Sequence, residues 1–134
     1  MSLIKKEYDK DGNLLFEGEF LNGQKWNGKG KEYDEYGKLK FEGEYLNEVR
    51  NGKGKGKEYE YGKLIFEGEY LNGKRNGKGK EYFNNTFLKF VGEHLNGEKN
   101  GKGKEFYNNG MLKFMGEYSK GKKLKEKNVI TMGI

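Results

Sequence analysis

The sequence lacks cysteine, proline and alanine, and it is poor in hydrophobic residues. Without cysteine there can be no disulfide bond and no thiolate metal site. The absence of alanine and the presence of 23 glycines disfavour long helices. Only 32% of the residues are hydrophobic, which argues against a thick two-layer core. Aromatic residues nevertheless make up 15% of the chain, more than disordered chains carry, so we expect order from local rules and aromatic packing.

Long apolar runs are absent as well. No run of about 18 apolar residues could form a membrane-spanning helix, and no charged-then-apolar signal segment opens the chain. We therefore expect a cytoplasmic protein that is either soluble or peripheral to a membrane. The 27 Lys and Arg outnumber the 21 Asp and Glu, which fits an acidic partner. The acidic residues are interleaved with the basic ones, however, and this weakens that interpretation.

The main signal in the sequence is an internal repeat. Phenylalanine recurs at spacings of 25, 25, 24 and 24 residues, and each one opens a near copy of the same motif. Self-similarity at this period indicates stacked units of supersecondary structure. The repeated phenylalanines are Phe16, Phe41, Phe66, Phe90 and Phe114. The predicted divisions are an N-terminal partial repeat or cap at 1–15, full repeats at 16–40, 41–65, 66–89 and 90–113, the start of a fifth repeat up to residue 118, and a degenerate C-terminal repeat or basic tail at 119–134.

Each unit alternates in polarity with a period of two. In the second unit, Phe41, Gly43 and Tyr45 alternate with lysine and glutamate, which predicts a strand with one buried face. A shorter strand is expected at 30–33 and at the equivalent positions. Because isolated hairpins are unstable in water, they must add side by side. The sequence therefore predicts an all-β fold: an elongated, twisted, single antiparallel meander of tandem β-hairpin repeats.

Two Asn-Gly pairs in each unit are candidates for the hairpin turn. In the third unit they are Asn72–Gly73 and Asn76–Gly77. Asn-Gly readily supplies the positive φ angles that tight hairpin turns require. The spacing alone does not decide which pair forms the turn and which forms a strand bulge.

Residues 66–82 read F-E-G-E-Y-L-N-G-K-R-N-G-K-G-K-E-Y, and the segment resembles the MORN (membrane occupation and recognition nexus) repeat. The resemblance extends from 16 to 118. The sequence departs from the pattern at Trp26, at Glu48 and within 51–57, where we expect bulged loops. The resemblance implies a twisted ribbon of β-hairpins without a shared catalytic residue. It also implies roles in membrane association, protein scaffolding or dimerisation.

Residues that could carry chemistry have structural explanations. His94 occupies the position of Tyr45 and Tyr70 in other units, so we interpret it as a packing residue and expect no metal site. Glu42 and Glu44 recur beside lysines, which favours a cross-strand charge ladder over acid-base catalysis. The G-K-G-K-G-K run at 52–57 lacks the order of a phosphate-binding loop. We predict no enzyme activity, no cofactor and no small-molecule substrate.

The repeated aromatic residues form the first candidate surface. A single-layer sheet leaves one face uncovered, so the rings could form an apolar strip for a protein partner or for a second copy of the chain. The alternative is that the rings pack on glycines of adjacent strands. The predicted interaction residues are Phe41, Tyr45, Phe66, Tyr70, Tyr82 and Phe90.

The basic turns and tail form the second candidate surface. They could contact anionic phospholipids, although a solvated terminus is the alternative for the tail. The predicted lipid-contacting residues are Lys74, Arg75, Lys99, Lys122, Lys123 and Lys125. Lysines that alternate with aromatics could also grip single-stranded nucleic acid, but glutamates share the same strands, so no nucleic-acid partner is predicted.

These features favour a non-enzymatic scaffold that mediates protein-protein interaction or self-association, with a homodimer as one form. The first alternative is a module that binds anionic membrane surfaces. The second alternative is an accessory segment of a larger enzyme or toxin system. The fold by itself does not choose among them.

Overall fold

The computed structural model describes most of the chain. The described residues are 2–21, 28–46, 49–50, 55–84 and 86–126. The sequence departures at Trp26 and Glu48 lie outside them, as do residues 51–54 of the glycine-lysine run and the tail beyond Glu126.

The regular structure of the described residues consists of twelve β-strands. They are β1 (Ser2–Tyr8), β2 (Leu14–Leu21), β3 (Gly28–Tyr33), β4 (Leu39–Leu46), β5 (Val49–Arg50), β6 (Lys55–Glu60), β7 (Lys63–Leu71), β8 (Lys74–Phe83), β9 (Phe87–Leu95), β10 (Glu98–Phe106), β11 (Leu112–Ser119) and β12 (Lys122–Glu126).

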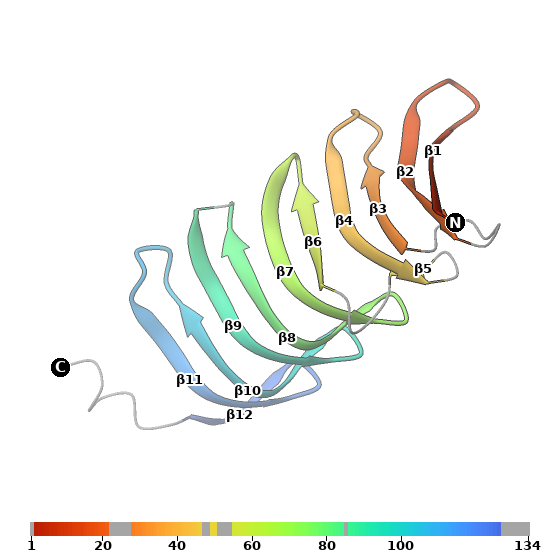
Figure 1. The fold of residues 1–134 in the computed structure, drawn as a ribbon. Coiled ribbons are helices and arrows are strands. Elements are labelled where there is room, and N and C mark those ends of the chain that lie inside the picture. Colours follow the sequence, from red (N-terminus) through yellow and green to blue (C-terminus); the bar gives the residue numbers. More distant parts are fainter. Residues whose placement is uncertain (1, 22–27, 47–48, 51–54, 85, 127–134) are drawn as a thin grey trace.

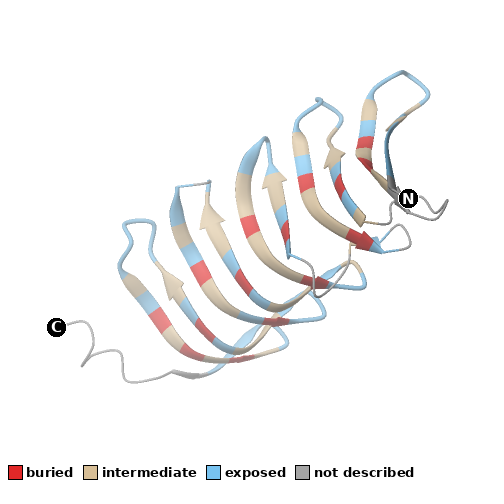
Figure 2. Ribbon diagram, viewed as in Figure 1, coloured by how far each residue is buried: buried red, intermediate tan, exposed pale blue. Residues whose placement is uncertain are grey.

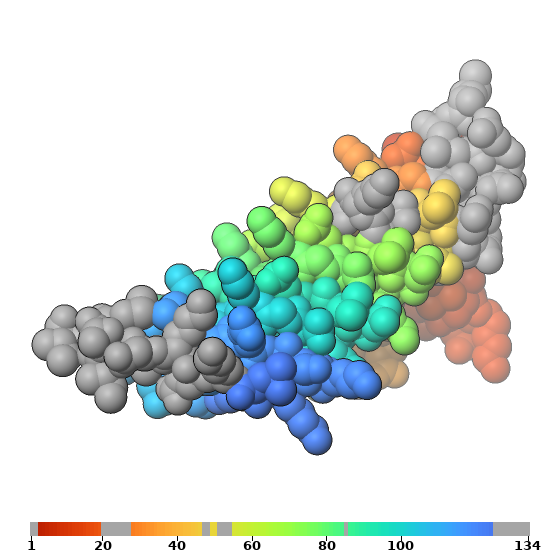
Figure 3. Space-filling view, turned by 90° about the horizontal axis from the view of Figure 1, so that it is seen from below, coloured from red at the N-terminus to blue at the C-terminus, as the bar shows by residue number. Residues whose placement is uncertain are grey.

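All the strands belong to one open antiparallel sheet. Their order is β1-β2-β3-β4-β6-β7-β8-β9-β10-β11-β12, and the short β5 pairs with β4 beside this path. Figure 1 shows the hairpins side by side along an elongated ribbon. In Figure 3 the colours follow one another from one end of the molecule to the other, so sequence order is also spatial order. The predicted meander of tandem hairpins is confirmed.

The two Asn-Gly pairs have different roles. Asn72 and Gly73 both have positive φ, 51° and 82°, and they form the tight turn between β7 and β8. Gly77, at φ 103°, lies inside β8, where the register with β7 shifts. The Glu69 carboxylate accepts the N–H of Lys78 at 2.7 Å and ties down this bulge. The first pair is therefore the turn and the second marks the bulge.

The core is a single layer of aromatic rings on one face of the sheet. Figure 2 shows the buried positions recurring in successive hairpins. The most buried side chains are Phe16, Phe41, Tyr45, Phe66, Tyr70, Phe90, His94, Phe114 and Tyr118. A row of glycines crosses the sheet between the Phe and the Tyr positions. These glycines are register partners in the order Gly18, Gly30, Gly43, Gly56, Gly68, Gly79, Gly92, Gly103 and Gly116.

The glycine row is required by the rings that cover it. A Cβ at Gly56 would lie 2.5 Å from the Phe41 ring and 2.8 Å from the Tyr70 ring, closer than carbon atoms can approach. The rings therefore take the space that side chains would occupy. This packing gives a thin sheet a closely packed core without a second layer.

Candidate interaction faces

Each phenylalanine of the core is enclosed by neighbours from its own and the next unit. The Phe66 ring meets Tyr70 edge to face at 5.8 Å between centroids, and it meets His94 of the next unit at 5.3 Å. The Arg75 guanidinium lies 4.0 Å from the Phe66 ring centroid. The ring therefore contacts two aromatic groups and a cation as well as the glycine row.

The cation over the ring recurs along the ribbon. Each one stands nine residues after its phenylalanine, in the strand that returns from the hairpin turn. The pairs are Arg50 over Phe41 at 4.0 Å, Arg75 over Phe66 at 4.0 Å, Lys99 over Phe90 at 4.5 Å and Lys123 over Phe114 at 4.7 Å. The position is therefore part of the repeated core.

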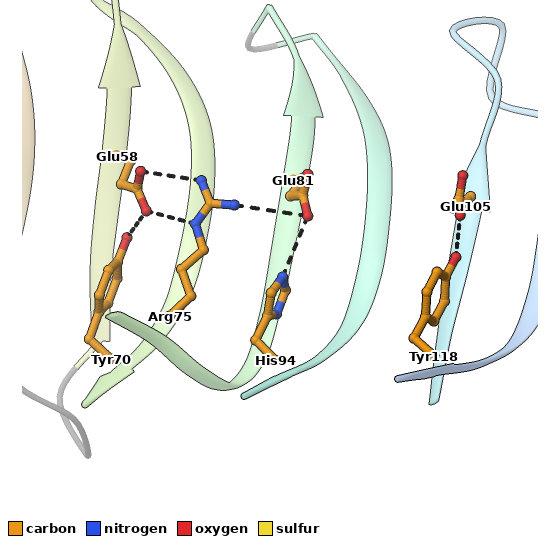
Figure 4. A network of polar contacts seen from close by, with 7 residues as sticks. All are labelled: Glu58, Tyr70, Arg75, Glu81, His94, Glu105 and Tyr118. Carbon is orange, nitrogen blue, oxygen red and sulfur yellow. Dashed lines mark hydrogen bonds and ion pairs between the residues drawn. The ribbon is translucent and has the colours of Figure 1, made fainter. Parts of the chain in front are cut away.

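A polar network bridges the units beside the rings (Figure 4). The Tyr70 hydroxyl donates to Glu58, and Arg75 donates to both oxygens of Glu58 at 2.8 and 3.2 Å. Arg75 also lies 4.0 Å from a carboxylate oxygen of Glu81. The Nε2 atom of His94 lies 3.4 Å from the same oxygen. Two neighbouring units thus share one chain of charged and hydrogen-bonded groups.

The network shifts the pKa values of its carboxyl groups. Burial alone would raise the pKa of Glu58, but hydrogen bonds from Arg75 and Tyr70 and the charge of Arg75 bring it below its usual value. Burial also opposes ionisation of Glu81, and the contact with His94 and the charges of Lys99 and Arg75 lower its pKa in the same way. Both groups are therefore held as carboxylates.

His94 fills a tyrosine position in this network, as its alignment with the other units predicted. It is buried, and its ring meets Phe66 and Phe90 edge to face at 5.3 and 5.4 Å. Its Nδ1 atom is buried and has no hydrogen-bond partner among the described residues. Among those residues, no three His, Cys, Asp or Glu side chains gather closely enough to hold a metal ion. The packing interpretation of His94 is confirmed.

The opposite face of the sheet carries a second series of hydrogen bonds. In three units the tyrosine that closes the short strand donates its hydroxyl to a glutamate of the preceding long strand. The pairs are Tyr33 with Glu17, Tyr59 with Glu42, and Tyr82 with Glu67. Burial and the Glu67 carboxylate raise the pKa of Tyr82 to about 12. These bonds fix the glutamate positions on that face.

This face contains a groove of about 1900 Å³ that runs across β2 to β10. Its floor is the backbone of the glycine row. The two walls consist mostly of glutamates from the long strands and lysines from the short strands in alternating order, with Ile4 of β1 and Val91 of β9 as apolar exceptions at the two ends. The lining includes Glu17, Lys31, Glu42, Lys57, Glu67, Lys80 and Val91 in one wall and Glu19, Lys29, Glu44, Lys55, Glu69, Lys78, Glu93 and Lys102 in the other.

The glutamates and lysines of the walls stand opposite each other across the strands. Glu42 is the register partner of Lys31 on one side and of Lys57 on the other, and Glu44 is that of Lys29. The register places the glutamates and lysines of the predicted charge ladder beside each other. The hydrogen bonds of the glutamates go to tyrosine hydroxyls, as for Glu42, or to backbone N–H groups, as for Glu69. The groove therefore presents fixed charges of both signs over a polar backbone floor.

The structure places most of the predicted interaction residues inside the molecule. Phe41, Phe66 and Phe90 have no exposed surface, and Tyr45 and Tyr70 expose 3% and 1%. The prediction that these five rings form an exposed strip is wrong, because neighbouring rings and cations cover them. The alternative, packing on the glycine row, is confirmed. Tyr82, the sixth residue, is half-buried on the opposite face, near the groove.

The predicted lipid-contacting residues separate into two groups. Lys74 and Lys122 are exposed near the hairpin turns. Arg75, Lys99 and Lys123 instead lie over core rings, and Lys123 is also 3.6 Å from Glu105. Arg75 and Lys99 are partly buried in these positions, whereas Lys123 stays exposed. Lipid contact by these residues stays a prediction. The side chain of Lys125 lies outside the described residues.

The carboxylates of the internal network were missed in the sequence analysis. Glu32, Glu58, Glu81 and Glu105 are the acceptors of the tyrosine or histidine of the next unit. The available signal was the constant position of each glutamate one residue before the closing aromatic. The groove was also missed, because strand alternation does not show how two rows of side chains enclose a floor.

The fold and the two faces define a β-hairpin repeat protein in which one face is packed internally and the other presents a charged groove. The family model of the MORN repeat matches residues 16–35, 41–55, 66–86 and 90–112, more than half of the chain. The chain belongs to the MORN repeat family. Repeats of this family are of a non-catalytic type and generally mediate interactions with proteins or membranes.

A search of curated proteins found no match to the chain. In the parts of the chain that the structure describes, there is no helix that could span a membrane.

Proposed function

We propose that this protein is a non-enzymatic interaction scaffold whose groove receives a segment of a partner protein. The observation that carries the proposal is the groove itself, which continues across the hairpins from β2 to β10. The rings of the aromatic face are buried by their own packing, whereas the groove face is open to a partner. Lysines and glutamates along both walls supply partners for charged side chains and backbone groups of a bound segment.

The absence of cysteine allows a direct test of this proposal. Peptides selected from a random display library for binding to the whole chain serve as the probe. A bulky maleimide label on the variant Lys57→Cys lies in the groove wall and should block peptide binding. The same label on Glu35→Cys, in an exposed turn, should leave binding unchanged. Equal binding to both labelled variants would show that the groove is not the site.

A second candidate function is contact with an anionic membrane surface, and one observation favours it. The edge formed by the β4–β5, β7–β8, β9–β10 and β11–β12 turns carries exposed leucines together with exposed lysines. They are Leu46, Leu71, Leu95, Leu124, Lys74 and Lys122. Apolar side chains beside lysines suit the boundary of an anionic bilayer.

Vesicle sedimentation tests this second function. Phosphatidylserine vesicles at low salt should sediment the chain, and vesicles of zwitterionic lipid should not. The double variant Lys74→Glu, Lys122→Glu should weaken the binding, whereas Lys57→Glu in the groove should not. Failure to sediment with the anionic vesicles at low salt removes this function.

A further inference from the structure

The C-terminal end of the groove differs in chemistry from the rest. One wall alternates Glu and Lys from β2 to β8 and then breaks the pattern. At the next two glutamate positions stand Val91 and Met115, on β9 and β11. Lys80 and Lys104 flank Val91 in the register, and Lys104 in turn faces Met115. The apolar wall segment, as we call it, begins inside the groove with Val91 and Lys80 and continues beyond the groove lining with Lys104 and Phe106 on β10 and Met115 on β11.

Two linked substitutions make this segment apolar. In three earlier units a tyrosine hydroxyl donates to the glutamate of the wall, as Tyr82 does to Glu67. In the fourth unit the glutamate position is Val91 and the tyrosine position is Phe106. The tyrosine hydroxyl that donates and the glutamate that accepts are both replaced, so neither partner of this hydrogen bond is left unpaired. Val91, Phe106 and Met115 are each partly exposed, which leaves them accessible to a bound side chain.

The apolar wall segment has an excess of positive charge. Lys104 lies between Val91 and Met115 in its row, whereas the equivalent Lys57 lies between Glu42 and Glu67. Lys80 on β8 and Lys104 on β10 therefore face apolar residues where the other units have glutamates. An acidic side chain of a partner would complete the charge pattern that this end lacks.

We propose that the apolar wall segment selects a stretch of a partner protein in which an acidic residue stands beside a large apolar residue. The carboxylate pairs with Lys104 or Lys80, and the apolar side chain packs against Val91, Phe106 and Met115. The N-terminal part of the groove, with balanced walls, accommodates the rest of the stretch with less discrimination. This inference rests on the proposed function of the groove.

Peptides from the same display library, panned against the whole chain, test the inference. The selected peptides should be enriched in Asp or Glu next to Leu, Ile, Phe or Met, and their binding should weaken as salt rises. Val91→Glu and Lys104→Glu should each weaken binding at least about tenfold, as measured by fluorescence anisotropy. The matched controls are Val49→Glu and Lys63→Glu, at exposed positions outside the groove, and these should change little.

The possible outcomes separate the inference from the function on which it rests. Val91→Glu is expected to fold, because glutamate occupies the equivalent position in three other units. If Val91→Glu and Lys104→Glu bind as wild type while the label at Lys57→Cys blocks binding, the inference is wrong and the groove function stands. If the label at Lys57→Cys also leaves binding unchanged, both the inference and the proposed groove function are wrong. A library that yields no binding peptide, or peptides without the acidic-apolar pattern, also overturns the inference.

Discussion

At the scale of single residues, several side chains of the repeated motif contact the neighbouring unit as well as their own. Tyr70 packs against Phe41 of the preceding unit at 5.1 Å and donates its hydroxyl to Glu58. Arg75 covers Phe66 and neutralises Glu58. The core of one unit is therefore completed by the next, which explains why the chain can fold with so few hydrophobic residues.

Removal of the central cation should cost more than removal of its exposed neighbour. Arg75→Ala leaves the half-buried carboxylates of Glu58 and Glu81 without their shared partner and uncovers Phe66. We expect a loss of about 2 kcal/mol in the free energy of unfolding. Lys74→Ala, one residue earlier and exposed, should cost no more than about 0.5 kcal/mol. Urea unfolding of both variants measures the difference, and equal losses would show that the network contributes little.

The network also predicts how stability depends on acid. The folded chain lowers the pKa of Glu58 and Glu81 below the usual 4.5. A carboxyl group whose pKa is lowered by folding stabilises the folded state at pH values above its unfolded-state pKa. This contribution is lost as the pH falls through the folded-state pKa. We therefore expect the free energy of unfolding to decrease once the pH drops below about 4.5.

Variants of single carboxyl groups identify the source of this acid sensitivity. Glu58→Gln should be less stable at neutral pH and should lose less stability on acidification than wild type does. Glu35→Gln, in an exposed turn, is the control and should follow the wild-type curve. Acid curves of the same shape for wild type and Glu58→Gln would assign the pH dependence to other groups.

At the scale of elements, the ribbon depends on glycines of two kinds. Gly73 and Gly77 provide positive φ at a turn and at a bulge, so that hairpins of fixed length repeat in register. The glycines of the row crossing the sheet have a different role, since they leave room for rings. The same residue type thus sets the backbone path in one place and the packing in the other.

The two kinds of glycine should respond differently to alanine. A Cβ at Gly79 would lie 2.5 Å from the Phe66 ring, so Gly79→Ala should cost about 3 kcal/mol through overpacking. At Gly37 nothing lies within 4 Å of the Cβ, and only the positive φ of 79° opposes the substitution. Gly37→Ala should therefore cost about 1 kcal/mol. Thermal unfolding followed by circular dichroism ranks the two, and a smaller loss at Gly79 would contradict the packing account.

At the scale of the whole molecule, the sheet has two open edges and two unlike faces. The β1 edge exposes Leu3 and Ile4, and the β12 edge exposes Lys122. Both edge strands carry exposed lysines, since Lys5 and Lys6 lie on β1, and lysines on an edge strand discourage pairing with another chain. A homodimer stays a prediction. The rings of the aromatic face are buried against one another, whereas the groove face is open to partners.

The sequence predicted the meander because the motif repeats in register and alternates with period two, and it predicted His94 as a packing residue from its position. It did not predict that Phe41 and Tyr70 lean toward each other over Gly56, because strand alternation assigns a face but not the direction in which a ring leans. The covering of Phe66 by Arg75 was missed for the same reason. Sequence patterns treat such a cation as a surface charge, whereas its aliphatic stem packs on the core.

The central claim is that the partner occupies the glycine-floored groove. Backbone amide signals of an isotopically labelled chain, recorded by nuclear magnetic resonance during titration with a selected peptide, test it most directly. The account predicts that the largest shifts fall on Gly79, Gly92 and the wall residues beside them, with the strongest changes near Val91. Shifts confined to the β1 edge or to the leucine-bearing turns, with the groove glycines unmoved, would contradict it.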